Sequence, residues 1–409
     1  MADRRRLLFL DPGHFHAALT LRVPHPRVAD EIVVYAPDGP ERRDFLALVD
    51  RFNARAADPT RWRVDVVTTD DPLTRLIAER RGDVVVLAGK NGGKARTIRR
   101  LHEAGLHVLA DKPWLVDAAD LEDVRVSLAG WPVVTEIMTG RHDVPARLFK
   151  RLVDAPAVFG EFRAEAPAIE MTSVHHLEKL VDGAPLRRPW WFFDVRVQGR
   201  GVVDIPTHLV DRAQWLAGGD LQLLSARTWP TRVPEDAFRR ITGEPEFPPA
   251  LRPRVDGGSL VYDCGAELVY RVGAVAVQAS ARWDLAPPPG GGDSSLLVAH
   301  GTRAALRLEQ SARSGHRRRL VVEGADGGAL EAVVRGVQAE LPGVRAERSD
   351  PHGIEIVIPA GLDGGHEAHF ALVLDDFLRA IDDGRWPKDV AERTLAKYAV
   401  LAEAARRTA

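Results

Sequence analysis

Cysteine is nearly absent from this chain of 409 residues, in which Cys264 stands alone. A single thiol excludes a disulfide framework within the chain and fits a reducing cytoplasm. Long apolar runs are absent too. The basic start, MADRRRLLFL, has only four apolar residues before Asp11, which is too short for a secretory signal. No stretch reaches the roughly 20 apolar residues of a membrane helix, so we expect a cytoplasmic protein with no membrane partner.

Net charge is small as well. The formal charge of -2 at pH 7 provides no general attraction to nucleic acid or to anionic lipid, so neither is expected as a partner. The hydrophobic share of 45% and the charged share of 28% are typical of a globular protein with a sizeable core. The length favours two domains.

The first third of the chain alternates short apolar runs with helical patterns. Strands are expected at LLFL (7–10), EIVVYA (31–36), RVDVVT (63–68), DVVVLAG (83–89) and HVLAD (107–111). Almost unbroken Val/Leu runs indicate strands covered on both faces, and the helical patterns between them indicate parallel βαβ units. Residues 1–133 are therefore predicted to form a doubly wound α/β domain with a parallel sheet.

The pattern changes after Trp131-Pro132. Alternating, strand-like segments dominate from about 155 to 360, with turn signals such as Asp256-Gly257-Gly258, and two helical segments close the chain. An exception is SVHHLEKLV (173–181), which we interpret as a helix. Residues 134–409 are predicted to form a second α/β domain with a large, mostly antiparallel sheet.

Two segments carry a more specific signal: DVVVLAGKNGGKARTIRRLHEAGLHVLADKPWLV (83–116) and GRGVVDIPTHLVDRAQWLAGG (199–219). In this order they resemble motifs of the Gfo/Idh/MocA oxidoreductases. Asn91 and Lys94 stand in a T-P-N-x-x-H-like turn, with Lys94 at the His place. Asp111, Lys112 and Pro113 fill the end of an AGKHVLCEKP-like motif, with Asp111 in place of Glu. The second segment matches D-x-G-x-H-x-x-D through Asp204, His208 and Asp211, with Pro206 in place of Gly.

The resemblance implies a Rossmann domain that binds NAD or NADP, followed by a substrate domain whose open sheet often forms oligomers. It implies hydride transfer to or from a secondary alcohol of a sugar, cyclitol or related polyol. On this basis Lys112 would polarise the alcohol, His208 would act as the general base, and Asp204 would orient the base or bind substrate. Asp204 would otherwise be a helix N-cap. A homodimer or homotetramer through the second sheet is expected.

The cofactor site departs from the family pattern. The three places of its G-x-G-x-x-G loop hold Asp11, Gly13 and His16, so only the middle glycine remains. The predicted cofactor-binding residues, some through backbone N–H groups and some through side chains, are Gly13, His14, Phe15, Asp38, Asn91 and Lys112. Asp38 would bind the ribose hydroxyls of NAD, whereas the neighbouring Arg42 and Arg43 could pair with a 2′-phosphate, so the choice between NAD and NADP stays open.

Further residues are weaker candidates. Arg141, His175 and His176 are expected to face the substrate. An H-x-H pair after a strand also resembles the first metal motif of amidohydrolases, which leaves a metal-dependent hydrolase using His14 and His16 as a rival function, although the later strand ends offer no further histidine. The family motifs would also fit a redox-neutral, NAD-dependent enzyme that cleaves glycosides, or a non-catalytic nucleotide-binding protein. No metal ligand is predicted for the favoured function.

Overall fold

The chain folds into two units that are not simply consecutive in sequence. The computed structural model describes residues 4–165, 167–181, 184–350, 353–362 and 364–409. The first unit comprises 1–142 and 364–399, and the second comprises 143–363 and 400–409. The predicted border at 133/134 therefore differs from the structural one at 142/143. The return of 364–399 to the first unit was not predicted.

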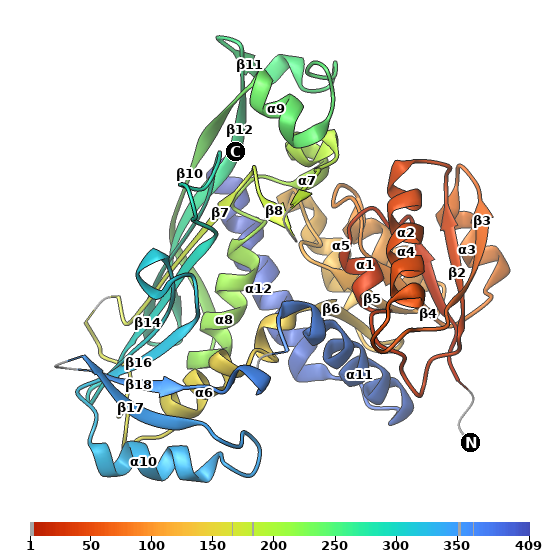
Figure 1. The fold of residues 1–409 in the computed structure, drawn as a ribbon. Helices are drawn as coiled ribbons and strands as arrows, with labels where there is room; N and C mark the ends of the chain where they lie inside the picture. Colours follow the sequence, from red (N-terminus) through yellow and green to blue (C-terminus); the bar gives the residue numbers. More distant parts are fainter. Residues whose placement is uncertain (1–3, 166, 182–183, 351–352, 363) are drawn as a thin grey trace. The chain divides into compact units, whose positions relative to one another are not determined.

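A six-stranded parallel sheet forms the centre of the first unit (Figure 1). Its order is β3-β2-β1-β4-β5-β6, which runs outward in both directions from β1 and β4, so the predicted doubly wound class is confirmed. The strands are β1 (Leu7–Leu10), β2 (Glu31–Ala36), β3 (Arg63–Thr68), β4 (Val84–Leu87), β5 (His107–Asp111) and β6 (Val134–Ile137).

The helices of the first unit join or flank these strands. They are α1 (His16–Leu19), α2 (Pro40–Ala54), α3 (Pro72–Glu79), α4 (Lys94–Glu103), α5 (Leu121–Ser127) and α11 (His369–Asp382), with short 3₁₀ turns η1 (Ala118–Asp120), η2 (Thr139–Arg141) and η7 (His366–Ala368). The last helix, α12 (Lys388–Arg407), contributes residues to both units.

The central strands are buried on both faces, as their apolar runs predict. Leu7 and Phe9 of β1 point to one face and share a core with side chains of α2 and α11. The alternate residues Leu8 and Leu10 are buried on the opposite face, because side chains alternate along a strand, and α3 packs against β1 and β2. Each large apolar side chain buried in this way contributes about 1.5–3 kcal/mol.

Two parts of the first unit correct the predicted boundary. β6 pairs in parallel with β5, but Glu136 interrupts its apolar run, so the segment does not stand out in the sequence as a buried strand. The apolar face of α11, which includes Phe370, Leu374 and Leu378, completes the core beside β1 and β4. A helix can return to a distant sheet in this way because burial depends on its apolar face and not on its position in the sequence.

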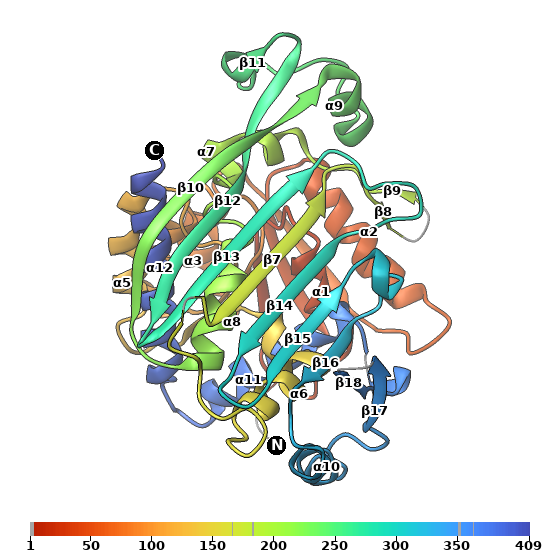
Figure 2. The ribbon, with the colours of Figure 1, turned by 90° about the vertical axis from the view of Figure 1, so that its left-hand side faces the viewer.

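A ten-stranded sheet dominates the second unit, and Figure 2 shows its strands face on. The main path is β10-β12-β13-β7-β14-β15-β16-β18-β17, with β11 beside β12, and all pairs except β13–β7 are antiparallel. The strands are β7 (Ile169–His176), β10 (Leu221–Pro234), β11 (Val255–Asp256), β12 (Ser259–Val272), β13 (Val275–Asp284), β14 (Ser294–His300), β15 (Ala305–Gln310), β16 (Arg319–Glu323), β17 (Arg345–Asp350) and β18 (Gly353–Val357), and β8 (Leu180–Val181) pairs separately with β9 (Ala184–Pro185). The predicted large, mostly antiparallel sheet is confirmed.

Helices of the second unit pack on this sheet. α8 packs on β12 and β13, α6 on β15 and β16, α9 on β10, and α10 on β17. Their bounds are α6 (Val144–Val153), α7 (Val195–Gln198), α8 (Pro206–Ala217), α9 (Glu235–Thr242) and α10 (Gly327–Gly336), and the 3₁₀ turns are η3 (Trp190–Phe193), η4 (Arg252–Arg254), η5 (Ala312–Ser314) and η6 (Ala360–Leu362).

The helix predicted over 173–181 is wrong. His175 and His176 end β7, which lies between β13 and β14 in the sheet. The segment IEMTSVHH has Met171 buried and Thr172 exposed in strand alternation, and pairing on both sides outweighs the helical spacing of its polar residues.

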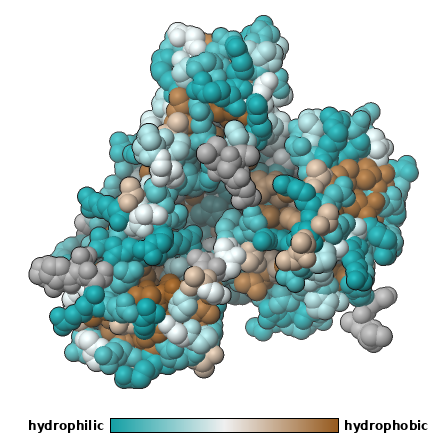
Figure 3. All heavy atoms as spheres, viewed as in Figure 1, coloured by the Kyte–Doolittle hydropathy of each residue, from teal (hydrophilic) through white to brown (hydrophobic). Residues whose placement is uncertain are grey.

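The surface visible in Figure 3 is mostly hydrophilic, with hydrophobic residues in small groups. Among the described residues, no helix has both the length and the apolar character needed to span a lipid bilayer.

We predict that stability falls on acidification because of His107, at the start of β5. Burial lowers the pKa of His107 to about 4, against the opposing effect of Asp83, and its Nδ1 accepts the backbone N–H of Val133 at 3.0 Å. The folded state therefore holds this ring neutral while the unfolded chain takes up a proton below pH 6.5. The contribution of His107 to the free energy of unfolding is complete above pH 6.5 and is lost as the pH falls towards 4. We expect the free energy of unfolding to fall by about 2 kcal/mol between pH 7 and pH 4.5.

Chemical denaturation at several pH values would measure this loss. His107→Asn keeps an acceptor near the Val133 N–H without a titratable ring, so its stability should depend less on pH over the same range. Equal slopes for the variant and the wild type would contradict the assignment to His107.

Candidate functional site

A buried carboxylate, that of Asp111, organises the carboxyl edge of the first sheet. Asp111 is the last residue of β5, and its side chain is 5% exposed. Its Oδ2 lies 3.1 Å from His14 Nδ1 and 3.0 Å from His16 Nδ1, while its Oδ1 accepts the backbone N–H of Lys112 at 3.0 Å. His14 from the loop after β1 and His16 from the start of α1 thus meet one carboxylate oxygen at the end of β5.

The protonation of this cluster follows from its burial. Desolvation lowers the pKa of His16 to about 4, although the Asp111 carboxylate acts in the opposite direction. Burial alone would raise the pKa of Asp111, but the interactions of its carboxylate with the His16 and His14 rings bring it well below its ordinary value. At neutral pH the cluster therefore combines a carboxylate with a neutral imidazole at His16.

The loop between β1 and α1 stands where a doubly wound sheet has its phosphate loop, but two of its N–H groups donate within the protein. Asp11 adopts a left-handed backbone with φ of 40°, which is a conformation that favours glycine. The N–H groups of Gly13 and His14 both donate to the Ala88 carbonyl, each at 3.1 Å. The loop approaches β4 so closely that a Cβ at Gly89 would lie 2.6 Å from the Asp11 carbonyl oxygen. Two of the predicted cofactor-binding N–H groups are thus engaged within the protein.

A buried ammonium lies on the other side of Asp111. Lys94 Nζ donates to Asn91 Oδ1 at 2.6 Å and to the Asp111 carbonyl at 3.0 Å. Burial lowers the pKa of Lys94 to about 8, despite the opposing effect of Asp111. Asn91, a predicted cofactor-binding residue, therefore holds Lys94 against the end of β5.

Lys112 stands in a turn that a second buried cluster supports. The Lys112–Pro113 peptide is cis, and the next residue, Trp114, donates its backbone N–H to the Tyr398 hydroxyl at 2.9 Å. Glu136 of β6 accepts hydrogen bonds from both Tyr398 and Lys397 of α12. Burial raises the pKa of Tyr398, and the Glu136 carboxylate adds to this effect.

A cavity of about 200 Å³ opens where the strand order reverses. Residues at the ends of β1 and β4 line it together with the first turns of α3 and α4: Leu10, Asp11, Pro72, Leu73, Leu87, Gly89, Lys90, Gly92, Lys94 and Thr97. The carboxyl ends of strands at such a switch point are where open α/β sheets bind their ligands.

Asp38, a predicted cofactor-binding residue, follows β2 and forms ion pairs with Arg42 and, at 3.3 Å, with Arg43.

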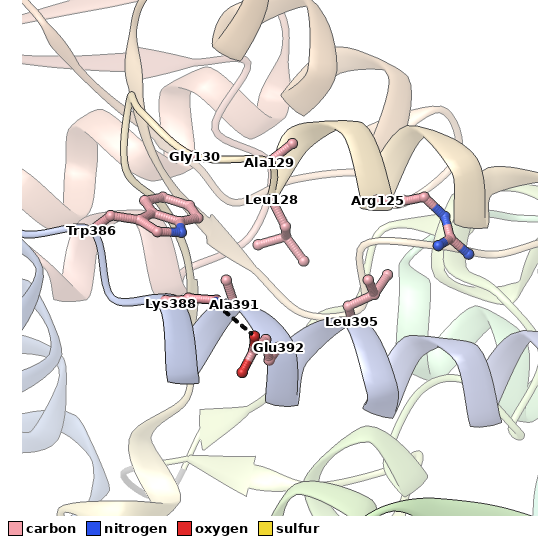
Figure 4. Close-up of a pocket in the computed structure, with 9 residues that line it drawn as sticks. All are labelled: Arg125, Leu128, Ala129, Gly130, Trp386, Lys388, Ala391, Glu392 and Leu395. Carbon is pink, nitrogen blue, oxygen red and sulfur yellow. Dashed lines mark ion pairs between the residues drawn. The ribbon is translucent and has the colours of Figure 1, made fainter.

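A second hollow of the first unit, about 380 Å³, lies between α5 and the start of α12 (Figure 4). Leu128, Trp386 and Leu395 give it a largely apolar lining, and Lys388 and Glu392 pair at its rim. It contains none of the predicted site residues, so we assign no chemistry to it.

In the second unit, Asp204 and His208 lie at the start of α8. The helix begins at Pro206 and Ile205 is its N-cap, so the alternative role of Asp204 as a capping side chain is wrong. Asp204 is 5% exposed, and its charge acts on Tyr262 and Cys264. Burial first, then Cys264 and Asp204, raises the pKa of Tyr262.

A cationic and aromatic cluster adjoins Asp204. Arg188 lies 4.6 Å from the centre of the Phe192 ring and 4.9 Å from that of Trp283, and donates to the Leu177 and His176 carbonyls. Burial lowers the pKa of Arg188, and the nearby Tyr262 and the carboxylate of Asp204 act in the opposite direction.

The predicted substrate residues His175 and His176 face a common carboxylate in this unit. Asp293 lies 3.4 Å from His175 Nδ1 and 3.2 Å from His176 Nδ1, and Lys179 donates to it at 2.7 Å. Burial would raise the pKa of Asp293, but His175 and Lys179 hold it below its ordinary value. Arg141, the third predicted substrate residue, lies in η2 and belongs to the first unit.

The structure thus groups the predicted residues by unit. His14, Asn91 and Lys112 surround Asp111 in the first unit, whereas Asp204, His175 and His176 belong to the second. The roles of Asp111, Glu136, Arg188 and Asp293 were not predicted from the sequence. Only Asp111 carried a signal, since it occupies a motif position that usually holds Glu.

Comparisons with known proteins agree with this architecture. Residues 148–409 match the family model described as "Putative oxidoreductase C terminal domain". The chain is similar to the crystal structure of a "putative oxidoreductase" from Parabacteroides merdae, with 35% identity, a TM-score of 0.93, and coverage of 99% of this chain and 97% of that one. No curated protein matches.

More distant solved structures share the fold. One is levoglucosan dehydrogenase in its apo form, with 16% identity, a TM-score of 0.64, and coverage of 99% of this chain and 98% of that one. Another is a 3-ketoreductase from Actinomadura kijaniata in complex with TDP-benzene and NADP, with 17% identity, a TM-score of 0.58, and coverage of 99% and 97%.

We predict that Glu136→Gln destabilises the first unit by about 3–5 kcal/mol, because it leaves the buried ammonium of Lys397 facing an uncharged amide. Replacing both partners, as Glu136→Leu with Lys397→Met, should cost less than the single change, since no buried charge remains. Denaturant unfolding of the two variants would measure the difference. A loss below about 1 kcal/mol for Glu136→Gln would contradict the importance of this ion pair.

Proposed function

Because the chain belongs to the Gfo/Idh/MocA family of oxidoreductases, we propose that it moves a hydride between a nicotinamide dinucleotide and a secondary alcohol. The substrate we propose is a sugar, cyclitol or related polyol. The observation that carries the proposal is the position of Lys112, which directly follows β5 in a sheet of doubly wound order.

The first unit offers suitable places for most of a dinucleotide. The cavity at the ends of β1 and β4 is suited to one end of the dinucleotide. Asp38, which follows β2, is suited to the ribose hydroxyls. The left-handed backbone of Asp11 preserves the tight turn that the first loop glycine normally provides. Because the N–H groups of Gly13 and His14 already donate to Ala88, the proposed diphosphate would take its hydrogen bonds from other groups than in the usual glycine loop.

Each proposed catalytic residue has one task. When bound, the nicotinamide supplies the acceptor or donor of the hydride. The Lys112 ammonium donates a hydrogen bond to the substrate oxygen and stabilises negative charge there as the C–H bond breaks. The His208 imidazole takes the hydroxyl proton, and the Asp204 carboxylate orients that ring or binds a neighbouring hydroxyl.

The second unit offers polar groups that suit the hydroxyls of a sugar or polyol. His175, His176 and Lys179 gather around the Asp293 carboxylate. A few such convergent donors and acceptors fix the orientation of a small ligand in its site. Assembly into a homodimer or homotetramer and a cytoplasmic location stay part of this proposal.

We predict that Lys112→Met and His208→Asn each lower kcat by about 100-fold or more, since each removes a group that acts on the reacting hydroxyl. Dinucleotide affinity should stay within a few-fold of the wild type for His208→Asn. A panel of sugars and polyols, followed by nicotinamide absorbance, would provide the assay. Lys388→Met and His300→Asn alter exposed ion pairs and serve as controls. Turnover within a few-fold of the wild type would contradict the assigned roles.

We predict that Asp38→Asn shifts the cofactor preference towards NADP by about tenfold or more, because it removes a negative charge and releases Arg42 and Arg43 for a 2′-phosphate. Titrations with NAD and NADP, followed by fluorescence or thermal shift, would measure both affinities. Asp44→Asn, which removes an exposed carboxylate from α2, the helix that carries Arg42 and Arg43, should leave the ratio unchanged. An unchanged ratio for Asp38→Asn would show that Asp38 does not face the ribose.

A further inference from the structure

Three side chains of metal-binding type converge in the first unit. One ligand atom from each of His14, His16 and Asp111 lies within 4.8 Å of the other two. We propose that these three residues bind a divalent transition-metal ion, a function that goes beyond hydride transfer and does not depend on it.

The distances suit a shared ion. His14 Nδ1 and His16 Nδ1 lie 3.1 and 3.0 Å from the same oxygen, Asp111 Oδ2. Two ligand atoms bound to one Zn²⁺ at about 2.0–2.1 Å lie about 3.0–3.5 Å apart. Each histidine therefore stands at the separation from the carboxylate that a common metal requires.

The surroundings hold the ligands in place. The second oxygen of the Asp111 carboxylate, Oδ1, accepts a hydrogen bond from the Lys112 N–H. This bond fixes the orientation of the carboxylate. The His16 ring packs against Phe370, with 4.7 Å between ring centres. Such outer contacts orient ligands and raise the affinity of metal sites. The loop itself is fixed to β4 by the hydrogen bond from the His14 N–H to Ala88.

Access and chemistry favour a particular class of ion. The side chain of His14 is 38% exposed, whereas those of His16 and Asp111 are 14% and 5% exposed, so solvent reaches the cluster from the His14 side. Two imidazoles and a carboxylate select Zn²⁺, Mn²⁺, Fe²⁺ or a similar ion over Ca²⁺ or Mg²⁺, which prefer oxygen ligands. Three protein ligands leave at least one position for water or another small ligand.

Metal analysis of the full chain would test the proposal. After treatment with a chelator, the protein would be equilibrated with Zn²⁺, passed through a desalting column and analysed for metal content, while calorimetry measures the affinity. We expect one tightly bound Zn²⁺ per chain and a higher thermal unfolding midpoint. Co²⁺ in place of Zn²⁺ should give a visible absorption band from the same site.

Variants distinguish this site from non-specific binding. His14→Ala and His16→Gln should weaken Zn²⁺ binding by more than the roughly 10–100-fold that loss of an outer contact costs. His14 is partly exposed, so His14→Ala should fold, and its unfolding midpoint without metal checks this. His25→Gln is the matched control. His25 lies 3.0 Å from a carboxylate of the same unit, that of Asp375, but this is a pair of one imidazole and one carboxylate and not a cluster of three ligands.

Less than one ion per chain in the wild type, or equal affinity in His14→Ala, would overturn the proposal. These measurements use no dinucleotide and no substrate. Failure of the metal site would therefore leave the proposed hydride transfer intact, and a failure to turn over any alcohol would leave the metal site intact.

Discussion

The buried carboxylate of Asp111 is the group on which the carboxyl edge of the first sheet depends. A charge at this depth is stable only when other groups compensate for the lost water. His14 in the loop after β1 and His16 at the start of α1 provide that compensation, and the Lys112 N–H provides it from the turn after β5. The β1–α1 segment and the turn that carries Lys112 are thereby both hydrogen-bonded to the Asp111 carboxylate. Residues with separate roles in the proposed functions are in this way part of one network.

The second unit follows the same principle with different residues. Asp293 gathers His175, His176 and Lys179 at one end of β7, and Arg188 lies among the aromatic rings near Asp204. Asp111 at the end of β5 and Lys94 at the start of α4 show that buried charges of the first unit gather where strands or helices begin or end, with the Glu136–Lys397 pair as an exception. This arrangement leaves the long apolar strands to form the cores, and it reserves the polar groups for binding and chemistry.

The fold was predictable from local patterns where those patterns were strong. The apolar runs at 7–10, 31–36 and 107–111 are strands with these bounds, because a strand buried on both faces admits few polar residues. The edge strand at 63–68 also has the predicted bounds, although it is partly exposed and alternates polar with apolar residues. The sixth strand was missed because Glu136 lies within it, and that carboxylate is stabilised by Lys397 and Tyr398 from the end of the chain. The histidines of β7 were assigned to a helix because local spacing carries no information about the two neighbouring strands that pair with the segment.

The sequence by itself determined the doubly wound sheet, the large antiparallel sheet and the family motifs around Lys112 and His208, since periodicity and short motifs are local properties of the chain. Only the tertiary structure decided which charged groups meet. His14 and Asp111 are separated by 97 residues, and Glu136 and Lys397 by 261, so no pattern within one segment could pair them. The tertiary structure also decided that α11 packs in the core of the first unit. The apolar face of a helix is buried wherever the rest of the fold leaves an apolar surface uncovered, and the sequence of the helix does not say where that is.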